Sequence, residues 1–495
     1  MAIIVRINKK ELEYDVWTLV RAFYPECDVL VDEDKISEYT GEVDFSMDIK
    51  LAFDGDIVRN IEVNIADKDY RLIDACEHSN FKEAKNHIKR MIYDTIGEYS
   101  NKSLPWGILT GIRPTKLSVS MLEEGKSEEE IREVLTKEYY VSAEKIDLSI
   151  EISKRELKLL KEIDYENGYS LYIGIPFCPS TCLYCSFTSY PISMYKNKSD
   201  MYVDALLKEI DFAKDVFKHK KLNTVYFGGG TPTALDAVQL DKLLSAVRAS
   251  FDFTYCKEFT VEAGRPDSIT EDKLEVLKKH NVTRISINPQ TMKQETLDII
   301  GRRHTVDDVI DKYNMARAMG FDNINMDFIV GLPNENYEDV ENSMKEVIKL
   351  NPDSITIHSL AIKRAARLNM FKDKYKEMSI DNNMEIMNMT ERYARSMEMT
   401  PYYLYRQKNM AGNMENVGYA RVDKAGIYNI LIMEEKQTIL ALGAGAITKY
   451  VFDKGGRIER VDNVKNVDQY IERIDEMIEK KREFCLNMMR CQEEK

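Results

Sequence analysis

The chain has 495 residues, of which 44% are hydrophobic and 31% are charged, and its formal net charge is −14 at pH 7. This length supports two or three domains, each large enough to bury a core. The acidic balance argues against a general binder of nucleic acid or of acidic membrane surfaces, although a local basic patch can still hold an anionic ligand.

The N-terminus becomes charged within its first ten residues and shows no cleavage site for a signal peptide, and no apolar run reaches roughly 18 residues. The chain has eight cysteines, three of which cluster. In a long chain without a leader this pattern favours metal or redox chemistry over disulfides. We therefore expect a cytoplasmic, monomeric protein without a membrane span.

Residues 1–165 are expected to form an N-terminal α/β extension. Residues 45–55 and 57–67 alternate as two strands across a turn at Asp54 and Gly55. Helices are expected at 81–100, 127–140 and 143–163. The Gly- and Pro-rich segment 104–116 is expected to be a packed loop, or a loop that docks onto the next domain. The sequence of this region does not indicate a particular chemistry or role.

Residues 166–375 alternate short β-branched runs with helical stretches. The runs are 171–177, 223–230, 258–264, 284–290, 323–331 and 354–360. Six successive β/α units predict a parallel sheet with right-handed crossovers. Six is fewer than the eight of a complete TIM barrel, so we expect a partial, open (β/α)6 barrel or a doubly wound sheet.

In either fold, ligands bind at the carboxyl ends of the strands. Several unusual residues lie at or near these ends, namely Cys178, Gly228 to Gly230, Glu262, Gln290 and Asp327. Residues 376–495 are expected to form a mixed, mainly helical C-terminal domain, with a charged surface helix from about residue 470.

The segment IGIPFCPSTCLYCSF, residues 173–187, places Cys178, Cys182 and Cys185 in a C-x3-C-x2-C pattern directly after a strand. Cysteine thiolates hold iron–sulfur clusters, and three ligands on a four-iron cluster leave one iron open to a substrate. Two other interpretations stay open. One is three buried, inert cysteines; the other is a zinc site, which usually needs a fourth ligand, here from Cys256, His304 or His358.

CPSTCLYC resembles the CxxxCx(F/Y)C motif of the radical S-adenosylmethionine (SAM) superfamily, and further motifs follow in order over roughly 170–370. The resemblance implies a radical SAM barrel, with a 4Fe–4S cluster held by the three cysteines. It also implies that SAM chelates the fourth iron through its amino and carboxylate groups. Reductive cleavage of SAM then gives a 5′-deoxyadenosyl radical.

Motifs after the later strands carry the implied SAM contacts. GGGTPT, 228–233, would contact the methionyl amino group, although a plain turn is the alternative; Glu262 is otherwise read as a solvated loop acid. Arg302 lies twelve residues after Gln290, as in the family's Q-[SD]-F-x9-R stretch. Its fork suits the SAM carboxylate. Asp327, in NMDFIVGLP, would bind the ribose.

The implied catalytic residues are Tyr172 and the three cysteines. The implied set of SAM contacts is Tyr172, Tyr184, Phe187, Gly229, Gly230, Thr231, Glu262, Gln290, Arg302, Asp327, Ile329 and Ala361.

LYIGIPFCPSTCLYCSF further resembles the LYxHIPFC opening of the oxygen-independent coproporphyrinogen III oxidase (coproporphyrinogen dehydrogenase) group. Segment 402–419 and the long N-terminal extension are similar to those of its HemZ-type members. The resemblance implies anaerobic oxidative decarboxylation of two propionates to vinyls, giving protoporphyrinogen IX in haem biosynthesis. An external donor such as flavodoxin or ferredoxin would supply electrons.

A tetracarboxylate substrate also needs cations. The candidates, for each of which a solvated surface charge is the favoured reading, are Arg113, Lys363, Arg364, Arg367, Arg406 and Lys408.

Two positions depart from the pattern of the dehydrogenase. Gly174 stands where a histidine is usual, and Phe187 stands where the dehydrogenase proper has a fourth cysteine. Decarboxylation is therefore less strongly implied than SAM cleavage. Two alternatives stay open, a haem chaperone that keeps the cluster without decarboxylase activity and a radical SAM enzyme that acts on haem.

Overall fold

The computed structural model describes residues 1–55, 57–65, 70–78, 80–361, 363, 366–370, 378–407, 410–452 and 456–493. The chain divides into two compact units. The first contains Met1–Lys154 and Tyr405–Glu415, and the second contains Arg155–Leu404 and Asn416–Lys495. Most of residues 376–495 thus lie in the same compact unit as the barrel. The expected division into three functional domains, with boundaries at about 165 and 375, stays a prediction.

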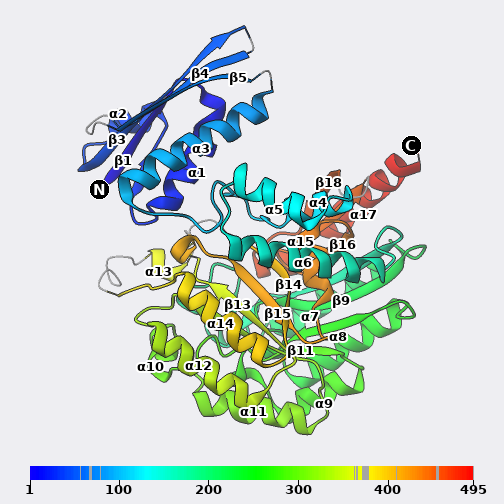
Figure 1. The fold of residues 1–495 in the computed structure, drawn as a ribbon. Helices are drawn as coiled ribbons and strands as arrows, with labels where there is room; N and C mark the ends of the chain where they lie inside the picture. The colour runs from blue at the N-terminus through cyan, green and yellow to red at the C-terminus, as the bar shows by residue number, and fades with distance from the viewer. Residues whose placement is uncertain are drawn as a thin grey trace. The chain divides into compact units, whose positions relative to one another are not determined.

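The first unit has a five-stranded sheet in the order β2-β1-β3-β4-β5. Its strands are β1 (Ala2–Ile7), β2 (Asp28–Leu30), β3 (Val43–Asp54), β4 (Ile57–Ile65) and β5 (Tyr70–His78). The apolar sides of helices α1 (Glu13–Phe23) and α3 (Phe81–Ser100) pack against it (Figure 1). The expected antiparallel pair β3–β4 across Asp54 and Gly55 is confirmed.

Four more helices belong wholly or mainly to this unit, and they are α2 (Glu33–Glu38), α4 (Lys116–Glu123), α5 (Glu128–Lys137) and α6 (Ala143–Lys161). The three helices expected in this region are therefore confirmed. Segment 104–116 packs by burying Trp106, whose Nε1 donates to Glu415 Oε2 at 2.8 Å. Lys145 Nζ donates to the other oxygen of Glu415 at 2.5 Å, so this buried carboxylate is paired.

The second unit contains an eleven-stranded sheet in the order β14-β15-β13-β12-β11-β10-β9-β6-β16-β17-β18. The six expected strands are confirmed as β6 (Gly168–Ile175), β9 (Lys221–Gly229), β10 (Glu258–Glu262), β11 (Arg284–Ser286), β12 (Ile324–Val330) and β13 (Ser354–Ser359). Neighbours among them pair in parallel and follow one another in chain order. A doubly wound sheet would reverse this order at a switch point, so the winding is that of a partial barrel.

The connecting helices lie on the outer side of the sheet (Figure 1). They are α7 (Ser199–Ala213), α8 (Ala237–Ser250), α9 (Glu271–Lys279), α10 (Gln294–Ile299), α11 (Val306–Ala318) and α12 (Tyr337–Leu350). Helices α8, α11 and α12 each begin at a capping box, formed at Asp236, Thr305 and Asn336. Strand β6 is buried along almost its whole length, which is why it reads as a continuous apolar run.

The C-terminal part of the chain completes this sheet. Its elements are α14 (Met384–Ser396), β14 (Thr400–Tyr405), β15 (Asn416–Ala420), α15 (Ile427–Glu434), β16 (Thr438–Leu442), β17 (Ile447–Phe452), β18 (Arg457–Asp462), α16 (Val467–Glu472) and α17 (Ile474–Glu493), with the short α13 (Arg367–Met370) before them. Strand β16 pairs in parallel with β6, and β15 pairs antiparallel with β13. The sequence did not predict that β16 joins the parallel strands.

The last helix is more than the expected surface helix, because part of it is buried. Lys481 of α17 is fully buried, and its Nζ donates to Glu209 Oε1 at 2.5 Å and to the carbonyl of Ala441 at 2.6 Å. Glu209 also accepts from Tyr470 Oη at 2.6 Å and from the amide of Gly443 at 2.8 Å. Removing one member of a buried pair leaves an uncompensated charge, which costs about 3–5 kcal/mol. In the described part of the chain, no helix has the length and apolar character needed to cross a bilayer.

Candidate active site

The segment from Phe177 to Pro191 carries the three clustered cysteines and is called the cysteine loop. It begins at the carboxyl end of β6. Strand β7 (Phe177–Cys178) pairs with β8 (Tyr190–Pro191), so the loop closes on itself. Its middle is tied to the segment before Arg302, because Leu183 N donates to the carbonyl of Ile300 at 2.9 Å and Ser180 Oγ to that of Gly301 at 3.0 Å. Residues far apart in the sequence therefore meet at this loop.

The three thiols have an environment that suits thiolate ligands. Thr231 Oγ1 donates to Cys178 Sγ at 3.4 Å, and Arg265 Nη1 donates to Cys182 Sγ at 3.4 Å. Burial raises the pKa of the Cys178 thiol to about 11 and also raises the pKa of Cys185. Cys178 and Cys185 therefore become thiolates when a metal takes the place of their protons.

The spacing of the thiols favours a cluster over a single ion. The sulfur atoms of Cys178, Cys182 and Cys185 do not all lie within 4.8 Å of one another. Among the described residues, a trio of possible metal ligands this close together is found at Cys76, His78 and His87 instead. One zinc ion with Zn–S bonds of about 2.3 Å needs sulfurs about 4 Å apart or closer. A cluster distributes its thiolate ligands over several irons. Cys256, a candidate fourth zinc ligand, donates instead to the carbonyl of Glu258, where β10 begins.

The glycine run after β9 lies directly against the cysteine loop. Gly229 has φ +107°, and a Cβ on Gly230 would lie 2.5 Å from the carbonyl oxygen of Phe177 and 3.0 Å from Cys178 Sγ. The amides of Gly230 and Thr231 donate to the carbonyls of Ile175 and Phe177, each at 2.7 Å. This approach requires residues without a side chain, which is more than a plain turn needs.

Glu262 ends β10 among aromatic rings and is no solvated acid. Tyr226 Oη donates to its Oε1 at 2.5 Å. Burial, together with the nearby charge of Asp327, raises the pKa of Glu262 to about 7, and the hydrogen bond from Tyr226 opposes this rise. The ring of Tyr226 stacks on that of Tyr428 at 4.4 Å between centroids, and Tyr172 stacks with both at 6.3 Å. Tyr428, which comes from α15, was not among the residues predicted from the sequence.

Arg302 has an open donor at the site. Its Nη1 donates to the carbonyl of Asn288 at 2.5 Å, and its Nε is buried without a partner. Burial alone would lower its pKa, but Tyr184 and Cys182 beside it raise the pKa above the ordinary value. A buried guanidinium with an unused N–H is suited to a carboxylate ligand. The burial of this open donor is the observation that best fits bound SAM.

Gln290 and Asp327 lie together across β11 and β12. Gln290 has φ +70°. Its backbone N–H donates to the backbone carbonyl of Asp327 at 3.0 Å, and its backbone carbonyl accepts from Ile329 N at 2.9 Å. Burial alone would raise the pKa of Asp327, but hydrogen bonds from His358, Asn325 and Thr356 lower it. Asp327 is therefore a charged acceptor, which suits ribose hydroxyls.

The other residues expected to contact SAM are spread over several elements. Ile329 is buried and lines a small cavity with Gln290, whereas Ala361 follows the end of β13. Phe187 is 69% exposed, and Lys363 Nζ lies 5.7 Å from its ring centroid. Tyr184 lies in the cysteine loop beside Arg302, and burial raises the pKa of its hydroxyl.

The candidate substrate cations differ in burial, and two of them lie outside the described residues. Arg364 and Lys408 lie outside the described residues. Arg406 is buried in the first unit, where its guanidinium donates to the carbonyl of Leu109 at 2.6 Å and to Asn413. Its Nε is buried without a partner, so Arg406 is not a solvated surface charge, and its role as a substrate cation stays a prediction. Arg367 is exposed, Arg113 is half-buried, and Lys363 is half-buried near the cysteine loop.

His304 is a buried residue that the sequence suggested only as a zinc ligand. Its side chain is fully buried, neither ring nitrogen has a hydrogen-bond partner, and Asp267 Oδ1 lies 3.9 Å from Nδ1. Burial and the charge of Arg302 lower its pKa to about 3, so the ring is neutral.

Comparison with known proteins agrees with this geometry. The sequence profile of the Radical SAM superfamily matches residues 172–347. The chain is 38% identical over 480 residues to the oxygen-independent coproporphyrinogen-III oxidase-like protein HemZ of Bacillus subtilis (strain 168), covering 96% of each chain. The chain belongs to this family of coproporphyrinogen-III oxidase-like radical SAM proteins.

Other relatives match the barrel. The haem chaperone HemW of Bacillus subtilis (strain 168) is 36% identical over 194 residues, which is 39% of this chain and 50% of that relative. The oxygen-independent coproporphyrinogen III oxidase of Escherichia coli (strain K12) is 32% identical over 196 residues, 40% of this chain and 42% of that one.

The structure of coproporphyrinogen III oxidase (HemN) from Escherichia coli, described as a radical SAM enzyme, has a TM-score of 0.51 and 23% identity. The match covers 65% of this chain and 73% of that one, and it shows the same fold. As a member of this family, the protein is a radical SAM enzyme whose cofactors are a 4Fe–4S cluster and SAM.

Proposed function

We propose that the protein catalyses the oxygen-independent oxidative decarboxylation of two propionates of coproporphyrinogen III, giving the two vinyls of protoporphyrinogen IX. The observation that carries this proposal is the 38% identity, over 96% of both chains, to a protein named for its likeness to that oxidase. Each propionate would give one hydrogen atom to the SAM-derived 5′-deoxyadenosyl group, and would then release carbon dioxide and one electron, which an external electron acceptor takes up. We place this reaction in the cytoplasm, with flavodoxin or ferredoxin as the external electron donor.

The residues at the sheet edge would hold the cofactors. We assign the cluster to Cys178, Cys182 and Cys185. The open Nε of Arg302 would bind the SAM carboxylate, and the close backbone of Gly229, Gly230 and Thr231 would bind the methionyl amino group. Asp327 would accept from the ribose, with Ile329 and Ala361 beside the adenine. Tyr172, Tyr184, Phe187, Glu262 and Gln290 complete the proposed site.

The bound cofactors would supply one-electron chemistry, namely abstraction of hydrogen from a propionate β-carbon. The protein would supply orientation and a dry surface. The stacked rings of Tyr172, Tyr226 and Tyr428 would provide part of this surface beside Glu262, which is itself partly exposed. Lys363, beside the exposed Phe187, is the described cation best placed to bind a substrate carboxylate near the cysteine loop.

The decisive experiment is anaerobic reconstitution followed by product analysis with coproporphyrinogen III, SAM and a reductant. We expect two carbon dioxide molecules per substrate, together with 5′-deoxyadenosine and methionine. Cys178→Ala should abolish all three products, while Cys256→Ala, which changes a thiol just before β10, should retain them. Cleavage of SAM with an unchanged porphyrinogen would contradict the decarboxylase assignment.

Haem binding without decarboxylation is a second candidate, because two positions favour it. Phe187 replaces the fourth cysteine of the dehydrogenase, and Gly174 replaces its histidine. A Cβ on Gly174 would lie 3.3 Å from both the carbonyl oxygen of Leu442 and the ring of Tyr172, so the backbone here is closely packed. Saturable one-to-one haem binding, together with no carbon dioxide release, would favour this candidate.

A further inference from the structure

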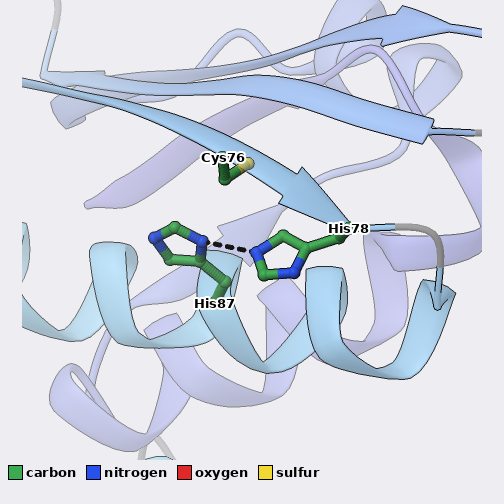
Figure 2. Close-up of side chains that lie close together, drawn as sticks. All are labelled: Cys76, His78 and His87. Carbon is green, nitrogen blue, oxygen red and sulfur yellow. Dashed lines mark hydrogen bonds between the residues drawn. The ribbon is translucent and has the colours of Figure 1, made fainter.

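Three metal-ligating side chains converge in the first unit, whereas the cysteine loop belongs to the second. Cys76 and His78 come from strand β5, and His87 comes from helix α3 (Figure 2). One ligand atom from each lies within 4.8 Å of the other two. His78 Nε2 and His87 Nδ1 are 2.8 Å apart, and all three residues are partly buried. Cysteine and histidine together are ligands that zinc and related transition metals prefer.

Backbone irregularity places the two strand residues at this point. Strand β5 pairs His78 with Val58 but Ala75 with Asn60, so β5 carries an extra residue between these pairs. Such a bulge re-aims side chains and is common next to functional sites. It lies at the edge of the sheet, where Cys76 Sγ is 3.6 Å from the carbonyl oxygen of Val58.

A carboxylate outside the trio orients one of the two imidazoles. His87 Nε2 lies 2.8 Å from Asp74 Oδ2, so Nε2 carries the proton and Nδ1 is left as the ligand atom. His78 Nε2 faces this Nδ1 at 2.8 Å, while Glu83 Oε2 lies near the other ring nitrogen of His78, at 3.9 Å. A carboxylate behind a metal-binding histidine fixes its tautomer and strengthens it as a ligand.

We propose that Cys76, His78 and His87 form a second metal site, which binds one divalent zinc-like transition-metal ion through one sulfur and two nitrogens. The ion would replace the hydrogen bond between the two imidazoles. With Zn–N bonds of about 2.0–2.1 Å, the two nitrogens need to separate to about 3.4 Å, which a small rotation of partly exposed rings provides. A water molecule would take the fourth position.

Such an ion would cross-link an edge strand to a helix. Among the strands that the structure describes, β5 pairs only with β4, so its outer side has no neighbouring strand. The bound ion would hold the end of β5 to α3 through covalent coordination and would stabilise the folded first unit by mass action.

The test uses the full-length protein with its iron–sulfur cluster reconstituted anaerobically, so that the loop thiolates are already occupied. Equilibrium dialysis against micromolar zinc, followed by elemental analysis, should find one zinc per chain in the wild type. Cys76→Ser, His78→Gln and His87→Gln should each lose it. Cys256→Ser and His280→Gln, which change matched residue types in the second unit, should retain it.

Two further measurements test the proposal even if a ligand variant folds poorly. Asp74→Asn keeps all three ligands and should weaken zinc binding about 10- to 100-fold, the usual effect of losing an orienting carboxylate. X-ray absorption at the zinc edge of the wild type should show one sulfur and two imidazole nitrogens. Absence of zinc from the wild type, retention of zinc by all three ligand variants, or a coordination of sulfurs alone would overturn the proposal.

Discussion

The two compact units differ in what they bury. The core of the first is a continuous set of apolar side chains from its sheet and from α1 and α3, such as Ile61 and Ile92. At the carboxyl edge of its sheet the second buries charged groups, among them Arg265 and Arg302. Burying apolar area stabilises a fold, whereas burying charge costs free energy unless partners compensate it. The first unit also buries charge, but its Glu415 is paired with Lys145, whereas Arg302 at the sheet edge of the second unit keeps an Nε without a partner. The sheet edge of the second unit therefore has the character of a site for chemistry.

The largest expected effect tests the chemical side of this comparison. Cys182→Ala removes a thiolate next to Arg265, and we expect complete loss of cluster iron and of the brown absorbance, with no loss of folded first unit. Iron analysis and visible spectroscopy of anaerobically purified protein measure the cluster, and circular dichroism measures the fold. A variant that keeps its iron would remove Cys182 from the site.

The stability side is tested by Ile92→Ala. Ile92 is fully buried in α3, so truncation should lower the free energy of unfolding by about 2–5 kcal/mol. Iron content and SAM affinity should stay unchanged. Ile112→Ala, which truncates a side chain that is 59% exposed in the same unit, is the control and should have little effect on urea unfolding.

Arg302→Ala should weaken SAM binding without loss of the cluster. A hydrogen bond to a charged group contributes about 1.5–3 kcal/mol, so the dissociation constant should rise about 10- to 100-fold. Arg303→Ala is a matched control, because Arg303 is the exposed neighbour. Isothermal titration with SAM distinguishes them, and wild-type affinity in the Arg302 variant would refute the carboxylate assignment.

The smallest expected effect is on pH dependence. Because the pKa of Glu262 is about 7 in the folded protein against an ordinary 4.5, the folded state binds more protons than the unfolded chain between these values. Stability of the cluster-free protein should therefore fall as pH rises from about 4.5 to about 7, by about 1–2 kcal/mol given partial solvent access. Glu262→Gln should flatten this slope in urea unfolding, and an unchanged slope would assign it to other groups.

The sequence predicted what is local. The three cysteines, the glycine run and the six β/α units each lie within a short segment whose pattern reveals them. It could not predict that β16 pairs with β6, because that register joins residues more than 260 positions apart, such as Tyr169 and Thr438. Tyr428 was missed for the same reason. The cluster at Cys76 was missed because β5 is largely exposed and does not alternate.

The buried pair of Glu209 and Lys481 has a consequence for synthesis of the chain. Glu209 belongs to the helix that follows the cysteine loop, but its partner is made some 270 residues later, close to the C-terminus. Until residue 481 has been synthesised, Glu209 lacks the cation that compensates its burial. Packing of α7 therefore depends on a segment that is translated much later, and a substitution at Lys481 acts on the barrel itself.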